Sequence, residues 1–146
     1  MKVALIGATG FVGRALLEEL LSRGHEVTAL ARHPEKLAAR ERLRVVRADV
    51  SDAAQVQAAV AGNDAVLSAY NAGWRNPDIY HDFMQGSRAI VAGTRAAGVK
   101  RYLVVGGAGS LYTADGVQLV DTPAFPPAFH DGARAARDAL EDLKGE

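Results

Sequence analysis

The sequence contains no cysteine among its 146 residues. Disulfide bonds, thiolate metal sites and a cysteine nucleophile are therefore excluded, and we predict no metal site. An excess of charge of one sign is also missing, because 17 Lys and Arg residues balance 17 Asp and Glu residues. A chain without net charge gives no global electrostatic case for binding nucleic acid or an anionic membrane. We therefore expect neither as a partner.

Long hydrophobic runs are missing as well. No stretch approaches the roughly 20 apolar residues of a membrane span, and the N-terminal apolar run is too short for a signal peptide and is broken by Gly7. These features predict a cytoplasmic protein that does not enter a membrane. The 49% hydrophobic and 23% charged residues are typical of a globular chain. The length predicts one domain over residues 1–146.

Short apolar strands alternate along the chain with segments of helical periodicity. Strands are predicted at 3–6, 26–30, 43–48, 64–70 and 101–105, and helices at 11–22, 34–40, 53–60, 77–97 and 132–144. Asp52 and Asp131 are predicted N-caps of the helices that follow them, and Gly24 and Gly98 are predicted to end helices. This alternation predicts an α/β fold, a doubly wound parallel sheet (Rossmann fold) with strand order 3-2-1-4-5 and helices on both faces.

A glycine-rich segment directly follows the first strand and opens the first helix. It reads Gly7-Ala8-Thr9-Gly10-Phe11-Val12-Gly13, with glycine at every third position. In this context Gly7 makes a tight turn, Gly10 allows close approach to a pyrophosphate, and Gly13 allows helix and strand to pack closely. The free N–H groups at the helix start then bind the diphosphate. The simpler alternative is a turn that only connects strand to helix.

Arg32 follows the second strand, where a dinucleotide fold reads the adenosine ribose. A site selective for NAD has Asp or Glu there to accept a hydrogen bond from the 2′-hydroxyl. A guanidinium instead pairs with a 2′-phosphate, so NADP (NADPH) is the predicted cofactor and NAD the second choice. His33 or Lys36 would assist, and the alternative is an ordinary solvated arginine.

Two further segments lie where a bound dinucleotide would pass. Asp49 and Val50 follow the third strand, where a carboxylate can accept from the adenine amino group and the next amide can meet the ring. Asp49 beginning a turn is the equally good alternative. Ser68, Ala69 and Tyr70 close the fourth strand beside the switch point where open α/β sheets bind ligands, which predicts backbone contacts to the cofactor.

Taken together, these residues resemble the short-chain dehydrogenase/reductase superfamily. The likeness is to its atypical NAD(P)H-binding branch, the NmrA-like and biliverdin-reductase-B-like proteins, and it covers essentially the whole chain. The glycine segment is similar to the family signature, Arg32 to its NADP-selecting arginine, Asp49-Val50 to its adenine pair, and residues 104–111 to its fifth strand and following loop. The resemblance implies a Rossmann fold that binds NAD(P)H.

The sequence departs from the superfamily pattern at the catalytic Tyr-x-x-x-Lys. None of the four tyrosines is followed by lysine four residues later. Ser110, after the fifth strand, resembles the family's active-site serine, and Tyr112 is a candidate proton donor, as are His81 and His130. We predict Ser110 and Tyr112 as the catalytic residues of an enzyme that works without the lysine.

The remaining functional candidates lie between Trp74 and the end of the chain. A loop of about twenty residues follows the Gly106 to Ser110 segment, unusually long for a small domain. Aromatic side chains could form an apolar substrate wall or simply pack in the interior, and they are Trp74, Tyr80, Phe125 and Phe129. Because members of this branch tend to continue past the last helix, we expect either a C-terminally truncated chain or a pocket completed by a second subunit. The open edge of the fifth strand is compatible with a homodimer.

Three functions fit these observations. The first is an NADPH-dependent oxidoreductase that transfers hydride to a small carbonyl-bearing or flat substrate. The second is a non-catalytic NADP(H)-sensing regulator of the NmrA-like type, which the missing Tyr-x-x-x-Lys favours. The third is an enzyme like the sugar-nucleotide epimerases and dehydratases, whose chemistry also relies on the absent pair.

Overall fold

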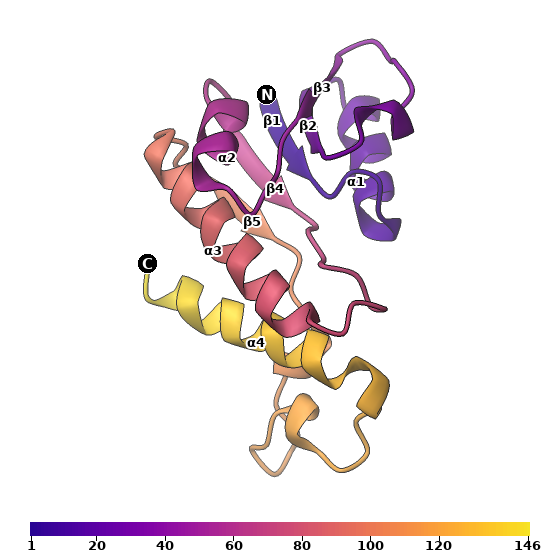
Figure 1. Ribbon diagram of the computed structural model, residues 1–146, viewed down its shortest axis with the longest axis vertical. Coiled ribbons are helices and arrows are strands. Elements are labelled where there is room, and N and C mark those ends of the chain that lie inside the picture. Colours follow the sequence, from indigo (N-terminus) through magenta and orange to yellow (C-terminus); the bar gives the residue numbers. More distant parts are fainter. The chain divides into compact units, whose positions relative to one another are not determined.

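The five strands form one parallel sheet in the order β3-β2-β1-β4-β5 (Figure 1). Their bounds are β1 Lys2–Ile6, β2 Glu26–Ala31, β3 Leu43–Arg47, β4 Ala65–Ser68 and β5 Tyr102–Val104. All four pairings are parallel. The predicted fold class and strand order are therefore confirmed. A computed structural model describes residues 1–146, which divide into a first unit (1–70 and 89–105) and a second unit (71–88 and 106–146).

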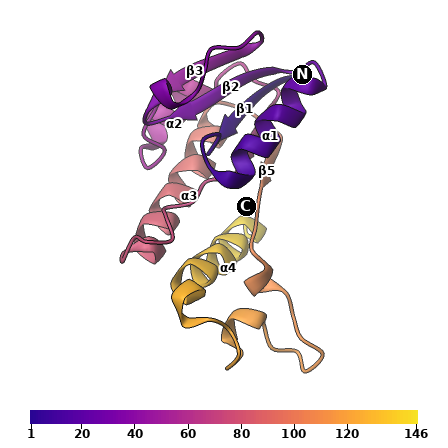
Figure 2. The same cartoon turned by 90° about the vertical axis from the view of Figure 1, so that its right-hand side faces the viewer.

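The sheet carries a hydrophobic core on each face. α1 (Phe11–Ser22) covers one face, and Leu17 and Leu21 pack there against Leu5 of the central strand. On the opposite face α2 (Ala53–Val60) and residues 89–96 of α3 (Ile79–Ala96) pack against the alternate residues of the same strand, Ala4 and Ile6. Figure 2 shows the strands edge to edge beneath α1. Burial on both sides explains why β1 is an unbroken apolar run.

The helices of the first unit end where glycine allows a left-handed residue. Gly24 and Gly98 have φ angles of 80° and 73°. After α3 the amide of Gly98 donates to the Arg95 carbonyl and that of Val99 to the Thr94 carbonyl, which is the Schellman arrangement. His25 and Gly24 repeat it after α1. Both predicted helix ends are confirmed.

The outermost strand β5 is the least buried part of the sheet. It pairs with β4 alone, and the amide of Val105, just beyond it, donates to the Ser68 carbonyl at 2.9 Å. The side chain of Leu103 is 56% exposed, and Val104 and Val105 are exposed as well. This strand therefore has a free edge and solvent-exposed apolar side chains.

Several local predictions were wrong. The segment predicted as a helix over 34–40 forms only a 3₁₀ turn at Pro34–Lys36. α3 begins at Ile79 rather than at Pro77, because Asn76 first forms a turn in which its Oδ1 accepts from the Asp78 amide. Within α3, Gly93 allows close packing against α2, since a Cβ there would lie 2.6 Å from both the Ala53 carbonyl oxygen and the Val56 Cβ.

The second unit is built around α4 (His130–Lys144) and three 3₁₀ turns. The turns lie at Ala108–Ser110, Leu119–Asp121 and Pro127–Phe129. Arg137 of α4 joins these parts, because it binds both carboxylate oxygens of Asp121 and also Asp138. Asp131 was predicted to cap α4 but lies within its first turn, where it faces Arg134 at 3.7 Å. No helix of the chain combines the length and apolarity needed to cross a membrane.

Candidate functional site

The glycine loop between β1 and α1 is closed by main-chain contacts that leave no space for a side chain at Gly7 or Gly13. The Gly10 amide donates to the Gly7 carbonyl at 3.0 Å. A Cβ on Gly13 would lie 1.8 Å from that same carbonyl oxygen. A Cβ on Gly7, whose φ is +84°, would lie 2.6 Å from the Ala69 carbonyl oxygen. Each of these two positions therefore requires glycine, as the motif predicts for Gly7 and Gly13.

The N-terminus of α1 is open to a ligand. Gly10 is the N-cap residue, has no side chain to accept from the first turn, and is followed by no acidic residue there. The amides of Phe11, Val12 and Gly13 are thus among the first N–H groups that lack an intrahelical acceptor. Phe11 is 96% exposed and Val12 is also exposed. Uncapped amides and the positive end of the helix dipole fit the pyrophosphate of a dinucleotide.

The end of β4 lies directly beside the glycine loop. The Ala69 amide donates to the Ile6 carbonyl at 2.9 Å, and Ala69 is the residue that a side chain on Gly7 would strike. Ser68 is 1% exposed, and its Oγ accepts from the Tyr70 amide at 3.3 Å. The structure therefore brings the predicted Ser68 to Tyr70 segment together with the loop. Thr9, in the same loop, is half-buried.

Arg32 lies just beyond β2 and is exposed. Its guanidinium makes no ion pair within 4.0 Å, although its charge helps to lower the pKa of Asp49. The larger causes of that lowered pKa are the hydrogen bonds that Asp49 Oδ1 accepts from the Ser51 hydroxyl and amide, at 2.7 and 2.9 Å. Asp49 is thus a turn-forming carboxylate that faces Arg32. Val50 beside it is half-buried against the core.

Sequence reasoning missed Arg47, the last residue of β3. Its Nη1 donates to the Arg32 carbonyl oxygen at 2.9 Å. Its Nη2 lies 4.0 Å from Oε2 of Glu35. β3 neighbours β2 in the sheet, with Ala31 opposite Arg47. The predicted strand order therefore already placed a cation beside Arg32, and that was the available signal.

Ser110 and Tyr112 belong to the second unit. The Ser110 Oγ donates to the Gly107 carbonyl at 2.9 Å. In this conformation the hydroxyl proton is therefore engaged in a hydrogen bond within the chain. Tyr112 forms an isolated antiparallel bridge with Gln118, and its side chain is 68% exposed. Nothing in the structure assigns either residue a catalytic role. Both therefore stay predictions.

The aromatic side chains of the second unit fall into two groups. Trp74 and Phe129 meet edge to face with ring centroids 5.4 Å apart, and both are about half exposed. Tyr80 is instead fixed within the unit, because its hydroxyl donates to Asp138 at 2.6 Å and Arg134 lies over its ring. The bond to Asp138 raises the pKa of Tyr80. Tyr80 therefore stabilises the unit, while the rings of Trp74 and Phe129 keep about half of their surface exposed.

Phe125 and the candidate proton donors His81 and His130 also belong to the second unit. Phe125 is half-buried and lies edge to face with His130. The Nδ1 of His130 lies 3.7 Å from Asp131, and His81 is exposed on α3. Phe125 thus belongs to the packing of the loop against α4, as the simpler alternative predicted.

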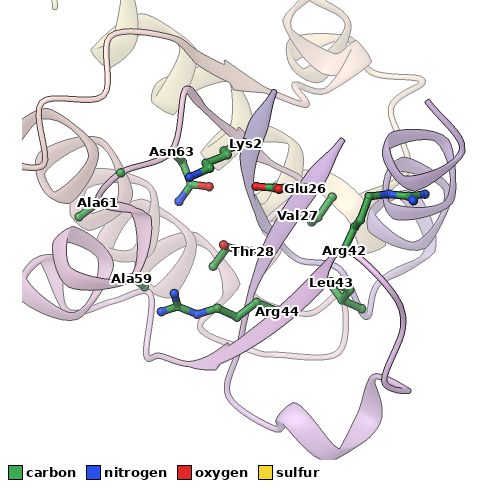
Figure 3. A pocket seen from close by; sticks show the side chains of 11 residues that line it. Lys2, Glu26, Val27, Thr28, Arg42, Leu43, Arg44, Ala59, Ala61 and Asn63 are labelled. Atoms are coloured by element: carbon green, nitrogen blue, oxygen red, sulfur yellow. The ribbon is translucent and has the colours of Figure 1, made fainter. Parts of the chain in front are cut away.

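A cavity of about 430 Å³ is lined by none of these residues. It opens at the amino ends of the strands, where Lys2, Glu26 and Arg44 line it (Figure 3). Arg42 points away from it and donates to the Leu21 carbonyl. Open parallel sheets bind their ligands at the carboxyl ends of the strands. The glycine loop follows the carboxyl end of β1, so the loop and this cavity lie at opposite ends of the strands.

Comparison with known proteins agrees with this geometry. Residues 7–145 match the model of the NAD(P)H-binding family. Over 146 residues the chain is 35% identical to the Bacillus subtilis protein YwnB and covers 66% of its length. It is 37% identical to a 2-alkyl-3-oxoalkanoate reductase from Stenotrophomonas maltophilia over 111 residues, which cover 69% of this chain and 32% of that protein.

Solved structures extend the comparison. A protein from Bacteroides thetaiotaomicron, provisionally described as an epimerase, is 46% identical with a TM-score of 0.89, over 99% of this chain and 65% of its own. One from Streptococcus pneumoniae, provisionally described as an NADH-flavin reductase, is 36% identical with a TM-score of 0.81, over 99% and 66%. The chain thus spans about two thirds of these relatives. The chain belongs to the NAD(P)H-binding family of Rossmann-fold proteins related to reductases and epimerases.

Proposed function

We propose that the chain is part of an NADPH-dependent oxidoreductase acting on a small carbonyl-bearing or flat substrate. The observation that carries the preference for NADPH is Arg32, an exposed guanidinium without an ion pair just beyond β2. No carboxylate stands at that position to accept from a 2′-hydroxyl. A 2′-phosphate offers the charge and the paired oxygens that a guanidinium binds best.

The residues of the first unit hold the cofactor in this proposal. The amides of Phe11 and Val12 bind the pyrophosphate, Arg32 binds the 2′-phosphate, and Asp49 accepts from the adenine amino group through the oxygen that Ser51 leaves free. When bound, NADPH supplies a hydride for the substrate carbon. The protein then has to orient the substrate, exclude water and deliver one proton to the substrate oxygen.

Ser110 and Tyr112 are the proposed sources of that proton and of substrate hydrogen bonds. Ser110 must release the Gly107 carbonyl before it can donate. The exposed phenol of Tyr112 needs no such change. Trp74 and Phe129 offer the apolar surface on which a flat substrate would lie. We also propose that the protein acts in the cytoplasm, where NADPH is available, and that it forms a homodimer.

The test is a pair of fluorescence titrations of the chain with NADPH and with NADH. We expect tighter binding of NADPH, and Arg32→Glu should weaken it about 10- to 100-fold while changing NADH binding little. Equal losses for both cofactors would refute the assignment of Arg32. Turnover is then assayed with a panel of carbonyl and quinone acceptors, with Ser110→Ala and Tyr112→Phe beside the unmodified chain.

The second candidate, a sensor of NADP(H), is favoured by the absence of any Tyr-x-x-x-Lys. It shares the binding residues and differs in having no turnover. NADPH binding that changes the association state of the chain, without oxidation of NADPH by any acceptor in the panel, would favour the sensor. The epimerase-like alternative predicts tight NAD binding and interconversion of a sugar nucleotide instead.

A further inference from the structure

Three charged side chains and one histidine lie together where Arg32 would meet the cofactor. They come from two neighbouring strand ends, Arg32, His33 and Glu35 after β2 and Arg47 at the end of β3. The carboxylate of Glu35 lies 3.4 Å from the His33 ring nitrogen Nδ1 and 4.0 Å from Arg47 Nη2. Arg32 alone among the four has neither an ion pair nor a side-chain hydrogen bond, so it is free to take a ligand.

The negative charge of Glu35 would disfavour a phosphate bound beside Arg32. Glu35 follows Arg32 by three residues in the 3₁₀ turn at Pro34–Lys36. A hydrogen bond from its own main chain lowers its pKa, as do the charges of His33 and Arg47, so the carboxylate is ionised at neutral pH. Like charges at short range repel. An uncompensated Glu35 would therefore oppose a 2′-phosphate and would suit a 2′-hydroxyl.

Arg47 contacts both the residue that would bind the phosphate and the carboxylate that would repel it. Through Nη1 it holds the main-chain carbonyl of Arg32, the residue that carries the phosphate-binding guanidinium. Through Nη2 it places a positive charge beside the Glu35 carboxylate. Its side chain is 70% exposed, so no core packing explains its position.

We propose that Arg47 is a positioning residue for cofactor selection, which orients Arg32 through its carbonyl and neutralises Glu35, so that the chain accepts a 2′-phosphate in preference to a 2′-hydroxyl. The proposal rests on the proposed function, because it assumes that Arg32 reads the 2′-phosphate. It adds two residues that the glycine motif and the position of Arg32 do not reveal.

The experiment measures dissociation constants for NADPH and for NADH in four variants. Arg47→Met removes the charge and the donor but keeps an unbranched side chain. We expect it to weaken NADPH about three- to tenfold and NADH less than twofold, as befits one hydrogen bond and one charge contact. Arg47→Met combined with Glu35→Gln should recover most of the loss, because the repulsion that Arg47 neutralised is then gone.

Two controls separate this role from a merely structural one. Arg44→Met removes another exposed arginine of the same strand, beside the cavity at the amino ends of the strands, and should leave both dissociation constants unchanged. Arg47→Lys keeps the charge and should retain most of the NADPH preference. Thermal unfolding of each variant checks that the fold is intact.

The outcomes separate failure of this inference from failure of the proposed function. If Arg32→Glu weakens NADPH selectively but Arg47→Met changes nothing, or weakens both cofactors equally, the role of Arg47 is refuted and the function stands. If Arg32→Glu weakens NADPH and NADH equally, the phosphate-reading site itself is refuted. Failure of Glu35→Gln to restore NADPH binding would refute the charge-compensation part.

Discussion

α1 and α2 begin in opposite ways, although both follow strands of the same sheet. Asp52 caps α2, and its Oδ1 accepts from the amides of Ala54 and Gln55. α1 begins at Gly10, with no side chain to accept and no acidic residue in its first turn. An N-cap satisfies amides that are otherwise left without an acceptor. The difference is that α2 has a stabilising side-chain cap, whereas the N-terminus of α1 is left uncapped, as the proposed pyrophosphate site requires.

Among substitutions at the start of α1, Gly13→Ala should have the largest effect. Its Cβ would lie 1.8 Å from the Gly7 carbonyl oxygen, so the loop that presents the α1 amides has to open. We expect the free energy of unfolding to fall by about 3 kcal/mol or more and NADPH binding to be lost. Denaturant unfolding and titration measure both. Gly106→Ala, where a Cβ meets nothing within 4 Å, is the matched control and should change stability by less than about 0.5 kcal/mol.

Giving α1 an aspartate N-cap like that of α2 should weaken cofactor binding while changing the stability of the fold little. Gly10 has a φ of −80°, and a Cβ there would make only an ordinary contact, 3.4 Å from the Gly7 carbonyl oxygen, so aspartate fits there. Gly10→Asp should change the free energy of unfolding by only about 0.3 kcal/mol and weaken NADPH and NADH alike, about 10- to 100-fold.

Gly10→Asn supplies the same cap without the charge. Its weaker effect on the two dissociation constants would isolate the electrostatic part of the loss. Unchanged cofactor binding in Gly10→Asp would contradict the assignment of the pyrophosphate to the N-terminus of α1.

Removing the cap of α2 should have the smallest effect, on stability alone. Asp52→Ala should lower the melting temperature by about 4 °C at pH 7 and leave NADPH affinity unchanged. Hydrogen bonds from Gln55, and then from the amides of Gln55 and Ala54, lower the pKa of Asp52.

A carboxylate with a lowered pKa in the folded state stabilises above its unfolded pKa, and this contribution is lost as the pH falls through the folded pKa. The difference in melting temperature between the unmodified chain and Asp52→Ala should therefore shrink on acidification. Asp52→Asn keeps an acceptor that does not titrate, so its melting temperature should lack this component of the pH dependence. A difference that stays constant from neutral to acidic pH would contradict the role of the charged cap.

The sequence predicted the sheet well because each strand carries its own signal. Successive apolar residues at 3–6, bounded by Gly7, can only be a strand buried on both faces, and helices between parallel strands then determine the order. The helix ends at Gly24 and Gly98 were equally clear, since a left-handed residue favours glycine.

What failed depended on tertiary contacts. Apolar character alone would bury Phe11 and Val12, yet both are exposed and the buried face of α1 runs through Gly13, Leu17 and Leu21. The glycine loop fixes the rotation of this helix, and hydrophobicity alone does not. The role of Arg47 was not predicted for a similar reason, because its partner is the main-chain carbonyl of Arg32, just beyond the neighbouring strand β2.

The position of β5 at the edge of the sheet has a consequence for the exchange of amide protons with solvent. β1 is hydrogen-bonded on both sides, whereas β5 is bonded to β4 alone. Because the Val105 amide faces β4, alternation along the strand turns the amides of Tyr102 and Val104 outward. In deuterated water these two protons should exchange within the earliest time points, while those of Ala4 and Leu5 persist until the whole sheet opens.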